Sequence, residues 1–255
     1  MIDVDRIRGI LFDYGGTIDS NGVHWAEVIW QAYLSEDIPI TKESFREAYI
    51  HGERTLGKNP LVKPYHTFLD MMRLKIDIQF EWLSIPQDAV SNTRHCEEGR
   101  RINPNLFENE CFSTRKHRIA DFCYAYARSS VECARPVINW IADKYPIALV
   151  SNFYGNIAAV LQDFEIDRFF PIIIESAVVG VRKPDPQIFR LGIEALQMKA
   201  AEVVVIGDSH DKDIIPAEVA GCQTIWLKNT GWNEYAGNEE ADLIIADFSE
   251  LIKWL

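Results

Sequence analysis

The stretch "GILFDYGGTIDS", Gly9 to Ser20, places an aspartate near the end of an apolar run and follows it with two glycines and a threonine. A continuous apolar run is typical of a strand that is covered on both faces of a parallel sheet. Asp13 then stands where such a strand ends. Because aspartate is common in turns before glycine, this stretch alone leaves both a structural and a chemical role open for Asp13.

Five later runs have the same character, and helix-length segments separate most of them. A succession of strand, helix and strand implies right-handed crossovers and parallel strands. We therefore predict an α/β fold built on a doubly wound parallel sheet. The predicted strands cover residues 9–14, 146–152, 171–175, 202–208, 223–227 and 242–246.

A long segment after the first strand breaks this alternation. It contains amphipathic stretches with apolar residues at helical spacing, such as "HWAEVIWQAYLSE" and "YHTFLDMMRLKI", and hardly any strand-like run. We predict that residues 20–130 form a helical domain inserted into the α/β core, which comprises residues 1–19 and 131–255.

The composition restricts the class of partner. The chain has 255 residues, of which 47% are hydrophobic, and a formal net charge of -12. A strongly acidic chain is a poor ligand for nucleic acid, which is bound through lysine and arginine. The five cysteines show no CxxC spacing, which favours free thiols in a reducing compartment. No segment has the apolar length of a membrane span or a secretory signal, so we expect a cytoplasmic monomer or homodimer without nucleic-acid or membrane partners.

Polar side chains follow several predicted strands at their carboxyl ends, where doubly wound sheets bind ligands. A lysine before Pro184 is held in an extended segment between the third and fourth strands, because a residue before proline avoids the α region. We predict that these side chains converge on one edge of the sheet. They are Asp13, Ser151, Asn152, Lys183, Asp208, Asp211 and Asp213.

The ordered set "FDYGGT", "ALVSN", "RKPDPQIF" and "VVVIGDSHDKD" resembles the haloacid dehalogenase superfamily. The resemblance covers roughly residues 1–19 and 131–255, and the helical insertion is similar to the alpha-helical C1-type cap of that superfamily. It implies a Rossmann-like core with a mobile cap that closes over the site. It also implies hydrolysis of a small phosphorylated metabolite through an aspartyl-phosphate on Asp13.

The resemblance assigns roles to the strand-end residues. It implies Mg²⁺ as cofactor, held by Asp13 and Asp208, and the backbone carbonyl of Gly15 would add an oxygen ligand of the kind that Mg²⁺ prefers. Asp213 or Asp211 would orient the waters of the metal from one shell further out.

Three further side chains would bind the phosphoryl group. The Ser151 hydroxyl, the Asn152 amide and the Lys183 ammonium would hold its oxygens while negative charge develops on them. The predicted catalytic set is Asp13, Ser151, Lys183 and Asp208.

One residue departs from the phosphatase pattern of the superfamily, which is Asp-x-Asp-Gly-Thr. Gly15 occupies the place of the second aspartate, whose carboxyl transfers protons in the family, a role that typically contributes 10²–10⁴-fold. Three functions stay open: a Mg²⁺-dependent phosphohydrolase with another proton-transferring group, a dehalogenase or other hydrolase of this fold, and a non-catalytic protein that binds a phosphorylated ligand or another protein.

The group that replaces this aspartate is not identified by the sequence. Asp19 is one candidate, but we favour for it the role of capping or hinging a helix that begins near Val23. Substrate contacts from the cap are expected among basic and aromatic side chains, namely His24, Trp25, Arg54, His66, Arg94, His95 and the run "RKHR" at 115–118.

Overall fold

A six-stranded parallel sheet forms the centre of the α/β part in the computed structural model, which describes residues 2–83, 104–230 and 240–255. The strand order is β3-β2-β1-β4-β5-β6, and every neighbouring pair is parallel. The predicted doubly wound α/β fold is confirmed, and each of the six predicted runs contains one strand. The strands are β1 Gly9–Phe12, β2 Ile147–Ser151, β3 Ile173–Glu175, β4 Val203–Gly207, β5 Gln223–Leu227 and β6 Leu243–Ile245.

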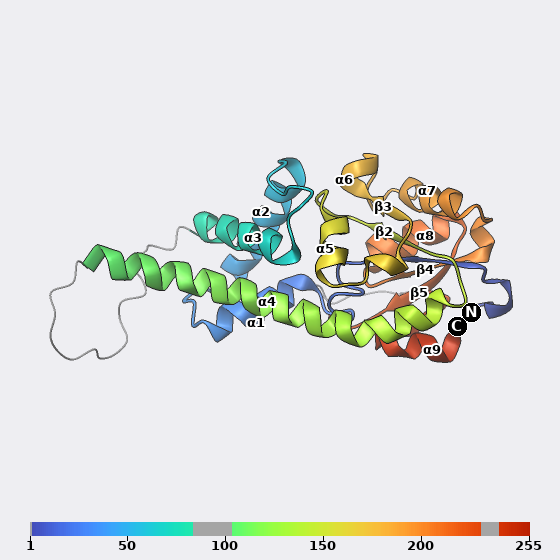
Figure 1. The fold of residues 1–255 in the computed structure, drawn as a ribbon, viewed down its shortest axis with the longest axis horizontal. Helices are drawn as coiled ribbons and strands as arrows, with labels where there is room; N and C mark the ends of the chain where they lie inside the picture. The colour runs from blue at the N-terminus through green and yellow to red at the C-terminus, as the bar shows by residue number, and fades with distance from the viewer. Residues whose placement is uncertain (1, 84–103, 231–239) are drawn as a thin grey trace.

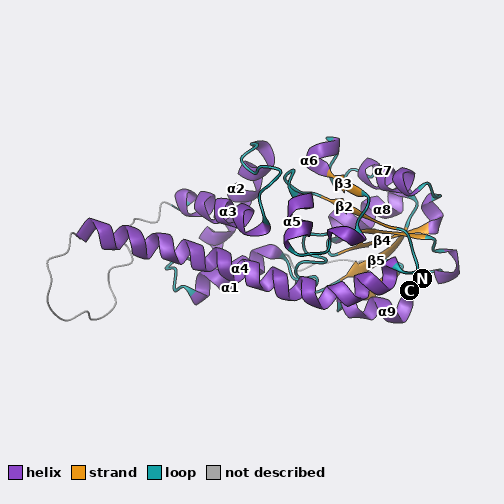
Figure 2. Ribbon diagram, viewed as in Figure 1, coloured by secondary structure: helices purple, strands orange, loops and turns teal. Residues whose placement is uncertain are grey.

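Successive residues of the central strands face opposite sides of the sheet. Leu11 of β1 and Val205 of β4 belong to the apolar core that contains Ile188 and Phe189 of α7. Phe12 of β1, one position further on, belongs to the core on the other face. Helices therefore cover both faces (Figure 2), and the central strands β1 and β4 are apolar because neither of their faces meets water.

Helices make up the rest of the described chain. Those of the insertion come first, and the short helices between the strands follow. They are α1 Trp25–Ser35, α2 Lys42–Lys58, α3 Phe68–Trp82, α4 Pro104–Ala142, α5 Ile157–Asp163, α6 Ser176–Val179, α7 Gln187–Leu196, α8 Ile215–Ala220 and α9 Leu251–Trp254, with a π-helical turn η4 at His210–Ile214 and 3-10 turns at Val4–Arg6, Asp167–Phe169, Ala200–Glu202 and Phe248–Glu250.

The helix α4 links the insertion to the sheet. It extends from beside α1 and α3 to the face of the sheet that α9 also covers (Figure 1). The predicted boundary between residues 130 and 131 falls inside this helix, so the insertion joins the core there through a continuous helix. The division into two domains stays a prediction.

None of the described helices combines the length and the apolar character that crossing a bilayer requires.

Candidate active site

Asp13 follows the last residue of β1, and its backbone N–H donates to the carbonyl of Ile206 in β4 at 2.9 Å. Three side chains contact its carboxylate. Lys183 Nζ lies 2.5 Å from Oδ1, Ser151 Oγ lies 3.5 Å from the same oxygen, and Thr17 Oγ1 donates to Oδ2 at 3.1 Å. Ser151 and Lys183, two of the residues predicted to converge on this edge, therefore reach Asp13, because parallel strands deliver their carboxyl ends to one edge.

Lys183 is held between two carboxylates. Its Nζ lies 2.6 Å from Asp213 Oδ1 as well as near Asp13, and all three residues are buried. Burial by itself lowers the pKa of this ammonium, but the two carboxylates outweigh it and raise the pKa above its ordinary value. The lysine therefore stays charged.

Asn152 fixes the backbone of the lysine segment. Its Nδ2 donates to the Lys183 carbonyl at 3.0 Å, and its Oδ1 accepts from the Lys183 N–H at 2.9 Å. Both bonds tie the end of β2 to the segment that precedes α7. In this arrangement Asn152 positions Lys183, and its contact with a phosphoryl group stays a prediction.

Asp208 completes an acidic cluster with Asp13 and Asp213. One oxygen of each carboxylate lies within 4.8 Å of the others. Burial raises the pKa of Asp208 well above its ordinary value, and Asp213 and Asp13 add to the effect. Burial likewise raises the pKa of Asp13 to about 6, with Lys183 opposing it.

The structure separates the two aspartates that the sequence left as alternatives. Asp213 is buried, and its Oδ2 accepts from the Ser209 N–H at 3.0 Å. The Asp211 side chain is 74% exposed. Asp213 is therefore the one that faces the cluster, because the π-helical turn η4 directs it inward.

The two glycines after Tyr14 serve different purposes. Gly16 has φ +100°, and a Cβ on it would collide with the Asp208 carboxylate. Glycine is therefore required there, both for the left-handed backbone and for the close approach. A Cβ on Gly15 would meet no atom within 4 Å, and its φ lies outside the left-handed range. The absent carboxyl of the phosphatase pattern thus leaves open space beside the cluster.

Asp19 does not cap a helix, so the capping role favoured from the sequence is wrong, and the hinge role stays a prediction. The N-cap of α1 is His24, whose Nδ1 accepts from the Ala26 N–H at 3.2 Å. The buried Asp19 carboxylate accepts instead from the Gly16 N–H at 2.7 Å and from Trp25 Nε1 at 2.9 Å. Burial raises the pKa of Asp19 to about 7.

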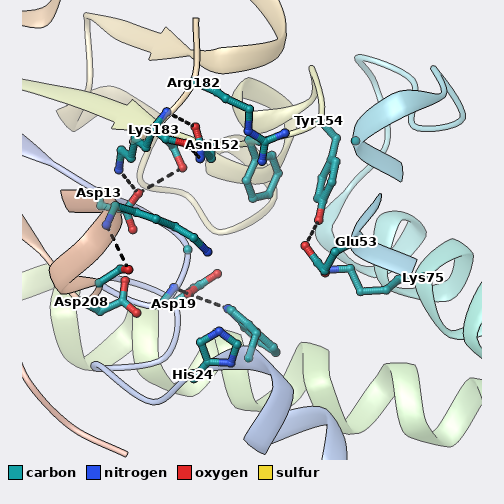
Figure 3. A pocket seen from close by; sticks show the side chains of 18 of the residues that line it. Asp13, Asp19, His24, Glu53, Lys75, Asn152, Tyr154, Arg182, Lys183 and Asp208 are labelled. Carbon is teal, nitrogen blue, oxygen red and sulfur yellow. Dashed lines mark hydrogen bonds and ion pairs between the residues drawn. The ribbon is translucent and has the colours of Figure 1, made fainter. Parts of the chain in front are cut away.

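A cavity of about 450 Å³ joins the strand ends to the inserted helices. Figure 3 shows the core residues Asp13 and Asp208 on one side of it and Glu53 and Lys75 of the helices on the other. Of the residues predicted to catalyse, to bind the phosphoryl group or to serve the metal, all but Asp211 lie on its wall. The lining residues are Asp13, Gly15, Gly16, Asp19, His24, Trp25, Tyr49, Glu53, Arg54, Gly57, Lys58, Phe68, Met71, Met72, Lys75, Ser151, Asn152, Phe153, Tyr154, Arg182, Lys183, Asp208, Ser209, Lys212 and Asp213.

The residues expected to supply substrate contacts from the cap divide into two groups. His24, Trp25 and Arg54 line the cavity, whereas His66 does not. The basic run 115–118 is also absent from its wall: Lys116 pairs with Asp77 at 2.9 Å, and Arg118 pairs with Glu36 at 2.6 Å. That run lies on α4 and stabilises helix contacts. Arg94 and His95 lie outside the described residues.

Several lining residues were not identified from the sequence. Lys75 of α3 is buried and lies 2.6 Å from Glu53 of α2, and Tyr154 donates to the same glutamate at 2.6 Å. No local pattern marks Glu53 or Lys75, since the two are 22 positions apart on separate helices. Arg182 and Lys212, by contrast, stand inside the quoted motifs "RKPDPQIF" and "SHDKD".

Comparisons with known proteins agree with this geometry. Residues 7–221 match the family of haloacid dehalogenase-like hydrolases. The chain is 33% identical to the glyceraldehyde 3-phosphate phosphatase of Pyrococcus furiosus over 260 residues, which cover 98% of this chain and 93% of that protein. It is also 33% identical to the phosphoglycolate phosphatase of Yersinia pestis, over 99% of this chain and 94% of that one.

Solved structures share the fold at lower identity. YfnB from Bacillus subtilis, solved with magnesium bound, superposes with a TM-score of 0.57 at 17% identity, covering 98% of this chain and 99% of that one. The structure of a dehalogenase with an intermediate complex superposes with a TM-score of 0.61 at 16% identity, covering 100% of this chain and 99% of that one. With the family match over most of its length and the strand-end cluster around Asp13, the chain belongs to the haloacid dehalogenase-like hydrolases.

Proposed function

We propose that the protein is a Mg²⁺-dependent phosphatase that hydrolyses small phosphorylated metabolites through an aspartyl-phosphate on Asp13. The observation that carries the proposal is the cluster of three carboxylates and one lysine at the inner end of the cavity. Relatives that align over almost their whole length, among them those of Pyrococcus furiosus and Yersinia pestis, are phosphatases, which supports the same chemistry.

The cluster suits a divalent cation. Within the part of the chain that the structure describes, Lys183 is the one buried cation that pairs with this cluster of three carboxylates, through Asp13 and Asp213. The pKa of Asp208 is raised in part because its neighbours repel its charge. Hard oxygen ligands of this kind are those that Mg²⁺ prefers. Asp13, Asp208 and the Gly15 carbonyl would hold the ion, which would neutralise phosphate charge near the nucleophile.

The residues of the site have separate roles in the proposed reaction. A carboxylate oxygen of Asp13 attacks phosphorus, the bond from phosphorus to the leaving oxygen breaks, and water later hydrolyses the acyl phosphate. Lys183 and Ser151, both in contact with Asp13, hold the oxygens of the transferred group. Asp213 and Asn152 keep Lys183 in place.

Asp19 is the group we assign to proton transfer. It is a buried carboxylate that lines the cavity outside the acidic cluster, and the charge of Asp13 adds to the burial that raises its pKa. A pKa of about 7 suits a group that both donates to a leaving oxygen and accepts from water near neutral pH. Trp25 and Gly16 fix its orientation through Oδ1.

The test is hydrolysis of a panel of phosphorylated metabolites with Mg²⁺ and with chelator. We expect phosphate release that requires Mg²⁺, is lost in Asp13→Asn and is retained in the control Asp211→Asn. Asp19→Asn should lower the rate and remove the pH dependence near neutrality, a change that a purely structural role would not produce. Metal-independent turnover of a haloacid would favour the dehalogenase alternative, and binding of phosphate esters without turnover would favour a non-catalytic protein.

A reducing, cytoplasmic location is part of the same proposal. It is supported by free thiols at Cys123, Cys133 and Cys222 in the described chain. A monomer or homodimer stays a prediction, which sedimentation would test.

A further inference from the structure

Four basic side chains surround the outer part of the cavity. Arg54 and Lys58 come from α2, Arg182 from the segment before α7 and Lys212 from the turn η4. All four residues are exposed. The ion pairs within residues 2–83, 104–230 and 240–255 include none of these four side chains. The chain has a net charge of -12, so a group of four cations around one cavity contrasts with the acidic character of the whole protein.

Three of these cations meet across the boundary between the core and α2. Nη1 of Arg182 lies 3.5 Å from the position that a Cβ on Gly57 would occupy. Arg54 and Lys58 are four positions apart, on the same face of α2, and flank Gly57. The Arg182 side chain extends from the Lys183 segment toward the Tyr154 side of the cavity (Figure 3).

Glu53, next to Arg54 in α2, also lines the cavity and has partners of its own. Glu53 is engaged by Lys75 at 2.6 Å and by the Tyr154 hydroxyl at 2.6 Å. Burial raises the pKa of Glu53, but Lys75 more than compensates and the pKa is lowered overall, with Lys212 contributing from a third element. Glu53 is thus an ionised partner of Lys75. It forms no ion pair with the four basic side chains in the described chain.

Like charges held close together repel, and a bound anion removes that repulsion. The planar guanidinium of Arg182 and that of Arg54 match a carboxylate in geometry, because each can donate two parallel N–H bonds. The same cavity holds the phosphoryl site at Asp13 and Lys183 at its inner end. A molecule with anionic groups at both ends fits this distribution of charge.

From this arrangement we propose that Arg54, Lys58, Arg182 and Lys212 form a second anion subsite, and that the preferred substrates are phosphate monoesters that carry a carboxylate. The inference rests on the proposed phosphatase function and names the substrate class. The phosphoryl group lies at Asp13, and the carboxylate lies between α2 and the Lys183 segment.

The experiment compares two substrates that differ only at the distal group, 3-phosphoglycerate with its carboxylate and glycerol 3-phosphate with a hydroxyl. We expect kcat/KM to favour the first by about tenfold or more, and Arg182→Gln and Arg54→Gln each to reduce that preference about threefold, as expected for partly exposed charge pairs. The control Arg190→Gln removes an exposed arginine of α7 that does not line the cavity, and it should leave both values unchanged.

Binding of the same two compounds to the Asp13→Asn variant separates the two proposals. Tighter binding of 3-phosphoglycerate that Arg182→Gln abolishes supports the subsite even if the parent protein hydrolyses neither compound. Hydrolysis of both at equal kcat/KM would keep the phosphatase and overturn the subsite. An equal loss for both substrates in Arg182→Gln would also overturn it, since that pattern indicates a general effect on the fold or the phosphoryl site.

Discussion

Lys183 Nζ lies 2.5 Å from Asp13 Oδ1, although 170 positions separate the two residues in the chain. The side chains of this pair are 2% and 7% exposed, and Asp213 contacts the same ammonium from the other side. The pair joins the end of β1 to the segment before α7. It also places a positive charge beside the carboxylate that we propose as the nucleophile.

Removing that charge is expected to destabilise the protein. Lys183→Met leaves two buried carboxylates without their cation, and breaking a buried pair in this way costs about 3–5 kcal/mol. Denaturant titration should show this loss in the free energy of unfolding, together with loss of phosphatase activity. Lys253→Met, at an exposed lysine of α9, should change stability by less than about 0.5 kcal/mol. Equal stability of the two variants would mean that the ion pair does not hold the site.

Magnesium should stabilise the folded protein through the acidic cluster. Saturation at about 100 times the dissociation constant adds about 2.7 kcal/mol, which thermal unfolding would report as a rise in Tm. Asp208→Asn should raise Tm in the absence of metal, because it removes repulsion with Asp13 and Asp213, and should abolish most of the Mg²⁺ effect. Asp211→Asn is the matched control, with its exposed side chain on the same turn. A full Mg²⁺ shift in Asp208→Asn would contradict the assignment of the site.

Gly15→Asp should raise phosphate-ester turnover. The added carboxyl enters open space two residues from the nucleophile, and a tenfold gain requires only about 1.4 kcal/mol of barrier lowering. Because Gly15 does not need a left-handed backbone, the variant should fold. Because proton transfer is assigned to Asp19, we expect a gain below about threefold in the parent protein, and a gain of tenfold or more would contradict that assignment. A folded, Mg²⁺-binding variant without activity on any substrate would contradict the phosphatase proposal.

Gly16→Ala is the structural counterpart. The new Cβ would collide with the Asp208 carboxylate at φ +100°, so a loss of about 1–3 kcal/mol in unfolding free energy and weaker Mg²⁺ binding are expected. Chemical denaturation with and without Mg²⁺ measures both effects. A Gly16→Ala variant as stable as Gly15→Ala would show that the loop readily rearranges.

The pH dependence of stability should reveal Asp19. Its pKa is about 7 in the folded protein against an ordinary value of 3.8, so between these limits the folded state binds a proton that the unfolded state releases. Stability from this group is therefore present at low pH and lost as pH rises toward and through 7. Asp19→Asn, which stays neutral, should match the parent near pH 4 and exceed it in unfolding free energy at pH 8. The exposed Asp211→Asn should show no such pH-dependent difference from the parent. A constant difference in unfolding free energy between Asp19→Asn and the parent from about pH 4 to about pH 8 would refute the shifted pKa of Asp19.

The sequence by itself determined the sheet and the inner site. Strands that are buried in a parallel sheet are mostly apolar on both faces, so all six strands could be predicted from apolar runs in the sequence. Since the carboxyl ends of such strands meet at one edge, Asp13, Ser151, Lys183 and Asp208 could be predicted to converge from their positions in the chain alone.

Tertiary structure decided what local patterns leave undetermined. The choice of Asp213 over Asp211 depends on the π-helical turn, and the position of Asp19 depends on the Gly16 and Trp25 donors that surround it. The residues of the outer cavity wall could not be predicted from the sequence either. Arg54 and Arg118 both belong to amphipathic helices, and only packing directs the first into the cavity and the second toward Glu36. The physical reason is that a helix pattern identifies its apolar face but not which neighbour, ion pair or cavity its polar face will meet.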